Sequence, residues 1–129
     1  MPLIRYELGD YAEVGTACSC GRGLPVLAKI HGRRRNMVTL PDGRRHWPSF
    51  PAEIWRDVAP VEQFRLVQRH LDRIEVNYVM ARDLTPEEMS QLESALASRF
   101  GFRFHIVWKR HGALDCGPGY KYEDFVSEL

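Results

Sequence analysis

The feature that most constrains the fold is a helix signal between residues 85 and 101. Thr85 is a favoured N-cap residue, Pro86 follows at the first helical position, and Glu88 stands three residues after the cap, which completes a capping box. Apolar residues then recur at helical spacing as far as Gly101, a typical C-terminal stop. The sequence therefore predicts one amphipathic helix over residues 86–100, which must pack against the elements around it.

Alternating apolar residues on both sides of this helix predict strands. Residues 64–68 and 73–80 precede the helix as two adjacent strands, and residues 102–108 follow it as a third. This order predicts an α+β fold, in which helices pack on a small, mostly antiparallel sheet. The apolar side chains that alternate along the second and third strands, and that we expect in the core, are Ile74, Val76, Tyr78, Met80, Phe102, Phe104, Ile106 and Trp108.

Shorter elements separated by turns are expected in the first 55 residues. The turn residues Pro41-Asp42-Gly43 predict a hairpin between residues 36–40 and 44–47. A short helix with Pro51 in its first turn is expected over residues 50–55. Before these elements, three short strands are predicted over residues 4–7, 11–14 and 26–30.

The composition is that of a globular domain. A chain of 129 residues with 44% hydrophobic and 27% charged residues is long enough for one core. No apolar run reaches the ~20 residues of a membrane helix, and the N-terminus lacks a signal-peptide pattern. Three cysteines, an odd number, fit a reducing compartment better than a disulfide framework. We therefore expect a cytoplasmic protein without a membrane partner.

Positive charge is concentrated between Arg22 and Arg45. This segment holds seven basic residues and a single acid, Asp42, although the net charge of the whole chain is only +1. One face of the protein should therefore attract anions such as phosphates. A small basic nucleic-acid-binding module is one interpretation, although the strands lack the pattern of exposed aromatic residues that reads single-stranded RNA.

Cys18 and Cys20 form a candidate metal half-site. Two thiolates this close in sequence can share one Zn²⁺, but a tetrahedral zinc site needs four ligands. Cys116, His31 and His46 are conceivable further ligands, although their spacing matches no zinc signature. The alternative interpretation is a pair of reduced thiols without a metal.

Several short segments, taken in order, resemble the late motifs of adenylate-forming ligases. The closest likeness is to the branch of phenylacetate-CoA ligases, coenzyme F390 synthetases and CapK-like capsule-biosynthesis enzymes. Each segment is a weak signal alone, and their shared order carries the resemblance. The segments are residues 2–10, Cys18-Ser19-Cys20-Gly21-Arg22, Ile30-His31-Gly32-Arg33, the Phe-Pro-x-Glu-Ile start at 50–54, the strand at 61–68 and the tail at 117–127.

The resemblance implies an activity, its ligands and four site residues. Such enzymes activate a carboxylic acid with ATP and Mg to an acyl-adenylate and then pass the acyl group to a thiol, usually that of CoA. Asp10 and Arg33 would bind the ribose of ATP or AMP. The carboxylate of Asp10 offers two acceptor oxygens to the ribose diol. A turn aspartate is the alternative interpretation of Asp10. Arg35 stands at the hinge position, where relatives have an acid, and Lys121 would be the catalytic lysine.

The resemblance also implies a division of the chain and a partner. Residues 1–31 would be the tail end of the β-subdomain of the large domain, with barrel-type strands, and residues 32–129 would be the C-terminal α+β lid domain. The phosphate loop and the acid pocket would come from a large N-terminal ligase domain, so we expect no catalysis by this chain alone. Some relatives complete the cysteine site from that domain. Unpaired strand edges in residues 1–31 leave an oligomerising interaction module as a further alternative.

Overall fold

The computed structural model describes residues 10–33, 36–115 and 122–129, and the chain divides into two compact units between Arg34 and Arg35. We call residues 10–33 the hairpin unit and the described residues from 36 onward the sheet unit. The resemblance described above implies a domain boundary between residues 31 and 32. The assignment of the two parts to domains of a ligase stays a prediction.

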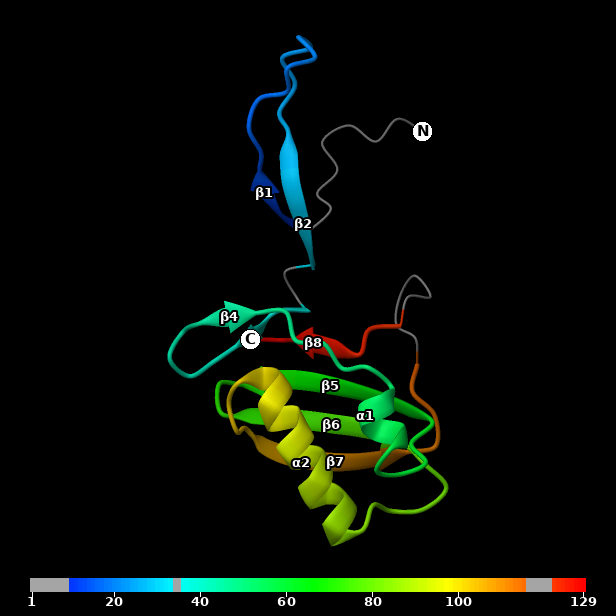
Figure 1. Cartoon of the computed structure of the whole chain (residues 1–129). Coiled ribbons are helices and arrows are strands. Elements are labelled where there is room, and N and C mark those ends of the chain that lie inside the picture. The colour runs from blue at the N-terminus through cyan, green and yellow to red at the C-terminus, as the bar shows by residue number, and fades with distance from the viewer. Residues whose placement is uncertain (1–9, 34–35, 116–121) are drawn as a thin grey trace. The chain divides into compact units, whose positions relative to one another are not determined.

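The hairpin unit is a two-stranded antiparallel ribbon (Figure 1). Its strands are β1 (Asp10–Val14) and β2 (Leu27–Arg33), where the sequence predicted strands. The pairing is irregular: β2 contributes one extra residue at Ala28 and another at His31, which have no partner in β1. Each is a β-bulge, which adds one residue to a strand and increases its local twist. The strand predicted over residues 4–7 lies outside the described residues.

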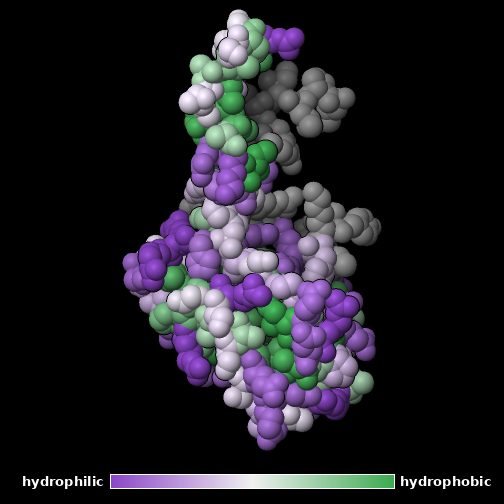
Figure 2. All heavy atoms as spheres, viewed as in Figure 1, coloured by the Kyte–Doolittle hydropathy of each residue, from purple (hydrophilic) through white to green (hydrophobic). Residues whose placement is uncertain are grey.

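The hairpin unit has no core of its own among residues 10–32, of which none is buried. Val14 is 82% exposed and Leu24 69% exposed, and Tyr11, Leu27 and Ile30 are also exposed. Figure 2 shows such apolar side chains on the surface of the hairpin. A two-stranded ribbon is at best marginally stable in water. The described part of this unit therefore leaves several large apolar side chains exposed.

The sheet unit contains a four-stranded sheet of mixed direction. The prediction of a mostly antiparallel sheet is wrong for it, because only one of the three neighbouring pairs is antiparallel. The chain runs from β6 through helix α2 to β7, and such a crossover returns the next strand in the same direction. The α+β class itself is confirmed, and no closed barrel occurs in the described parts of the chain. The strands, from one edge to the other, are β7 (His105–His111), β6 (Arg73–Val79), β5 (Gln63–His70) and β8 (Phe125–Ser127).

Both helices, α1 (Glu53–Arg56) and α2 (Pro86–Phe100), cover one face of this sheet (Figure 1). The predicted capping box is present in α2. The backbone N–H of Glu88 donates to Thr85 Oγ1 over 3.2 Å, and the Thr85 N–H donates to Glu88 Oε2 over 2.8 Å. Gly101 ends the helix at φ 66°, in the left-handed region. Neither helix, nor any other in the described chain, has the length and apolar character of a membrane span.

The core lies between the two helices and the sheet. The predicted apolar face of β6 is confirmed, since the side chains at 74, 76 and 78 are buried, together with Met80 just beyond the strand. Phe104 is buried as expected, but Phe102 is 38% exposed and precedes β7, which begins at His105. The prediction that Phe102 belongs to the core is therefore wrong. Its ring packs edge-on against that of Phe104, with centroids 4.9 Å apart.

A small hairpin joins the sheet through one buried amide. Its strands, β3 (Val38–Thr39) and β4 (Arg45–His46), flank the predicted turn. The Gln68 side chain in β5 is fully buried, and its Oε1 accepts a hydrogen bond from Thr39 N–H over 3.0 Å. Its Nε2 donates to the Thr39 carbonyl over 2.6 Å. The amide thus pairs with Thr39 as a neighbouring backbone strand would, which attaches β3 to the main sheet.

Candidate functional site

Two of the predicted site residues meet at the open end of the hairpin unit. Asp10 and Arg33 are register partners on β1 and β2. Asp10 is exposed, so its two carboxylate oxygens are accessible to a ligand. The structure thus brings the backbones of the two residues together from distant parts of the sequence. The predicted ribose contact itself stays a prediction.

A histidine and a glutamate next to this pair form a contact that the sequence did not reveal. His31, the bulged residue, has its Nε2 2.6 Å from Glu13 Oε1. Because a carboxylate only accepts hydrogen bonds, Nε2 carries the proton in this contact. From the sequence, His31 was proposed as a further zinc ligand and not as a partner of Glu13. No motif could have shown its pairing with Glu13, since the pairing depends on the bulge.

The two thiols lie in the loop that connects β1 to β2. Cys18 and Cys20 are both free and exposed. The Cys20 backbone N–H donates to Cys18 Sγ over 3.4 Å. The pKa of Cys20 is lowered, first by the backbone N–H of Arg22 and then by the Cys18 thiol, because both hydrogen bonds favour the thiolate. This part of the chain therefore presents two adjacent exposed sulphurs, of which that of Cys20 has a lowered pKa.

A closed zinc site is not formed by the described residues. Across the described ranges, no group of three His, Cys, Asp or Glu side chains is arranged to hold a metal ion. His31 is four residues beyond Leu27 along β2, about 13 Å from the loop end of that strand, and it contacts Glu13. His46 belongs to the sheet unit, and Cys116 lies outside the described residues. Two thiols alone do not satisfy the tetrahedral geometry of a structural zinc site.

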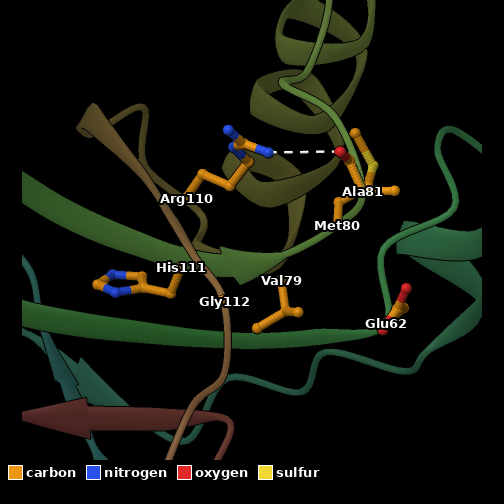
Figure 3. Close-up of a pocket in the computed structure, with 7 residues that line it drawn as sticks. All are labelled: Glu62, Val79, Met80, Ala81, Arg110, His111 and Gly112. Atoms are coloured by element: carbon orange, nitrogen blue, oxygen red, sulfur yellow. Dashed lines mark hydrogen bonds between the residues drawn. The ribbon is translucent and has the colours of Figure 1, made fainter.

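A separate pocket of about 370 Å³ lies in the sheet unit, where the parallel strands β6 and β7 end (Figure 3). Ligands of α/β proteins often bind beyond the carboxyl ends of parallel strands. Figure 3 shows the side chains of Arg110 and His111 pointing to opposite sides of β7. Arg110 forms an ion pair of 2.7 Å with Asp83. The residues that line the pocket are Glu62, Val79, Met80, Ala81, Arg110, His111 and Gly112.

A chain of hydrogen bonds ends at His111. It lies on the face of the sheet that α1 and α2 do not cover. Lys109 Nζ lies 2.6 Å from Glu75 Oε2, and Asn77 Nδ2 donates to Glu75 Oε1 over 3.0 Å. The amide oxygen of Asn77 is therefore directed at His111 Nε2, 2.7 Å away, which donates to it. Burial raises the pKa of Glu75, but the bonds from Lys109 and Asn77 outweigh it and the pKa is lowered.

The seven residues that line the pocket do not form a pair of nucleophile and base. Its lining residues include no hydroxyl or thiol nucleophile. The guanidinium of Arg110 forms an ion pair with Asp83, and the imidazole of His111 is hydrogen-bonded to Asn77. The titratable groups do not converge on one point, as a nucleophile and its base must.

The remaining predicted site residues lie outside the described chain. Arg35 and Lys121 are not among the described residues, so their predicted hinge and catalytic roles stay predictions. No known protein family matches the chain, and no curated protein matches it at a significant level. The resemblance to adenylate-forming ligases therefore rests on the motifs of the sequence.

Proposed function

We propose that this chain forms the C-terminal part of an ATP-dependent, acid-activating enzyme of the adenylate-forming type. The observation that carries the proposal is the register of Asp10 with Arg33. These two residues belong to motifs far apart in the sequence, and both are expected to contact the ribose. A shared ribose site requires that they lie side by side, and they do so at the level of the backbone.

The exposed surface of the hairpin unit supports the proposal. Val14, Leu27 and Ile30 are exposed in strands that have only each other as partners among the described residues. The proposed enzyme supplies the missing surface, because strands of this kind pack on a large β-subdomain in the family that the sequence resembles. Burying such side chains stabilises the folded state by about 1.5–3 kcal/mol each.

In the proposed reaction, the carboxylate of a small acid attacks the α-phosphate of ATP and pyrophosphate leaves. The thiol of CoA then attacks the acyl-adenylate, which forms a thioester and releases AMP. Asp10 would accept hydrogen bonds from the ribose hydroxyls and so orient the nucleotide. Lys121 would supply positive charge where negative charge develops during adenylation.

This chain is not expected to catalyse the reaction alone. Holding two substrates in line supplies about 7–11 kcal/mol of the barrier reduction in well-oriented reactions. The Gly/Ser/Thr-rich phosphate loop and the acid pocket that would do so are not among the segments of this sequence that resemble the family. They must come from a large ligase domain, which is the partner that we propose.

A titration with AMP tests the nucleotide contact. We expect the backbone amide NMR signals of residues 10–14 and 29–33 to shift as AMP is added to the labelled chain. Asp10→Asn should remove these shifts, because the neutral amide accepts fewer hydrogen bonds from the diol. Asp57→Asn, at another exposed aspartate, is the matched control and should leave them unchanged. Shifts confined to the pocket at β6 and β7, or no response to AMP, would contradict the assignment.

The alternative of a nucleic-acid-binding module has less support. Of the basic residues predicted to form an anion-binding face, Arg44 is bonded through its Nε to Asp42 over 2.7 Å. That contact uses one of the two cations at the tip of the β3–β4 hairpin. Salt-dependent binding of an oligonucleotide, abolished by substituting Arg45, would favour this alternative.

A further inference from the structure

The loop between β1 and β2 presents both thiols at one end of the hairpin unit. Gly15 N–H donates to the Val26 carbonyl over 2.6 Å, which closes the base of this loop. We call residues 16–25 the thiol loop. Gly21 and Gly23 both have positive φ angles, of 76° and 64°, and so turn the backbone directly after Cys20. The loop therefore has a defined turn that exposes Cys18 and Cys20 to solvent.

The thiol loop is suited to a soft divalent metal. The Cys20 N–H donates a hydrogen bond to Cys18 Sγ, and such outer bonds orient metal ligands. Thiolates are the preferred ligands of Zn²⁺ in structural sites, which take four of them or combine them with histidines. Cys18 and Cys20 supply half of that set.

The other half is not available within the described residues of one chain. His31 is held by Glu13 near the opposite end of β2, and no group of three candidate ligands occurs in the described ranges. A second copy of the chain would bring an identical pair of thiols. Two-fold symmetry is the commonest symmetry of protein dimers, and it joins a surface to itself.

We propose that one Zn²⁺ bridges two copies of this chain through Cys18 and Cys20 of each. Four thiols lose four protons when the site forms, and four Zn–S bonds replace the bonds from the metal to water. Apolar surface beside the site fits the same occupant. Leu24 lies within the thiol loop and is 69% exposed. A second copy would cover this side chain. The inference does not rest on the proposed ligase function.

The test uses the full chain with a phosphine reductant that keeps the thiols reduced. We expect added Zn²⁺ to double the molar mass measured by light scattering, with one metal bound per two chains. A chelator should return the monomer. Co²⁺ in place of Zn²⁺ should give the visible and sulphur-to-metal absorption bands of a tetrahedral thiolate site.

Three cysteine variants distinguish the possible ligands. Cys18→Ser and Cys20→Ser should each lose both metal binding and dimerisation, whereas Cys116→Ser is the matched control and should keep both. Circular dichroism checks that each variant is folded, which is expected for Cys18→Ser and Cys20→Ser because both side chains are exposed. One metal per chain without a change in mass would overturn the proposal. So would a site lost in Cys116→Ser, no binding at all, or a dimer that survives both substitutions.

Discussion

Arg33 lies opposite Asp10 because β2 holds two more residues than its pairing with β1 requires. At the loop end of the hairpin, Val14 pairs with Leu27. A regular antiparallel register from that point would place His31 opposite Asp10. The bulges at Ala28 and His31 each advance β2 by one residue, so that Arg33 takes this position. The geometry of the candidate ribose site therefore depends on two local irregularities of one strand.

The bulge at His31 depends on the backbone conformation of the next residue, Gly32. This residue has φ 116°, a conformation that residues with a Cβ rarely adopt. We predict that Gly32→Ala disturbs the pairing of Asp10 with Arg33, measured as loss of the cross-strand NOEs between β1 and β2. Gly112→Ala is the control, because a Cβ there meets nothing within 4 Å. The thermal midpoint of the sheet unit should change little in either variant, since the buried residues of the described chain begin at Met37 and Gly112 is exposed. An intact register in Gly32→Ala would contradict this account.

The buried amide of Gln68 should be important for stability. Its removal in Gln68→Leu leaves both the N–H and the carbonyl of Thr39 without their partner. Leaving partly buried backbone groups unpaired costs about 1–3 kcal/mol, so the free energy of unfolding should fall by that amount in chemical denaturation. Gln91→Leu makes the same change at an exposed position of α2 and should stay within about 0.5 kcal/mol of the parent. Equal effects of the two substitutions on the free energy of unfolding would show that the hydrogen bonds between Gln68 and Thr39 do not stabilise the protein.

Acid should remove the stabilising interactions of the Glu88 carboxylate at the start of α2. Hydrogen bonds from the Arg82 guanidinium, and then from the Thr85 N–H, lower the pKa of Glu88 from 4.5 to about 2. A lowered pKa in the folded state stabilises the protein above pH 4.5, and this stabilisation is lost as the pH falls from about 4.5 to about 2. Glu88→Gln should therefore lower the thermal midpoint near neutral pH, and the difference from the parent should disappear near pH 2.

Glu87→Gln is the matched control for this pH dependence. Glu87 also lies in the first turn of α2, but no ion pair of this side chain is found in the described structure. Its substitution should leave the shape of the pH profile unchanged. A difference between Glu88→Gln and the parent that stays constant from neutral pH to pH 2 would mean that Glu88 does not titrate with the lowered pKa.

Local signals predicted the elements of this fold well. The cap and first turn of α2 lie between Thr85 and Glu88, its stop at Gly101 directly follows the last helical residue, and the structure has each of them at the expected position. Alternation along β6 also identified its buried face, because side chains in a strand alternate strictly between the two faces. The sequence missed β8, a three-residue strand that is too short to show a period.

Long-range relationships were harder to predict than the elements. Whether β7 runs parallel or antiparallel to β6 depends on the crossover through α2, not on any residue within the strands. At the candidate site, the motifs identified Asp10 and Arg33 individually. Their mutual register was not predicted: Gly32 is a signal for the bulge at His31, but no residue type around Ala28 marks the other bulge, and both are needed for this register. The contact between His31 and Glu13 was missed for the same reason.

The most direct test of the central claim is acid-dependent exchange between ATP and pyrophosphate. This chain is mixed with the large domain of a phenylacetate-CoA ligase-like enzyme, and exchange of labelled pyrophosphate into ATP is followed in the presence of a panel of carboxylic acids. The account predicts exchange only when both proteins and an acid are present, and its reduction by Asp10→Asn but not by Asp57→Asn. Exchange by this chain alone, or a mixture no more active than the large domain by itself, would contradict it.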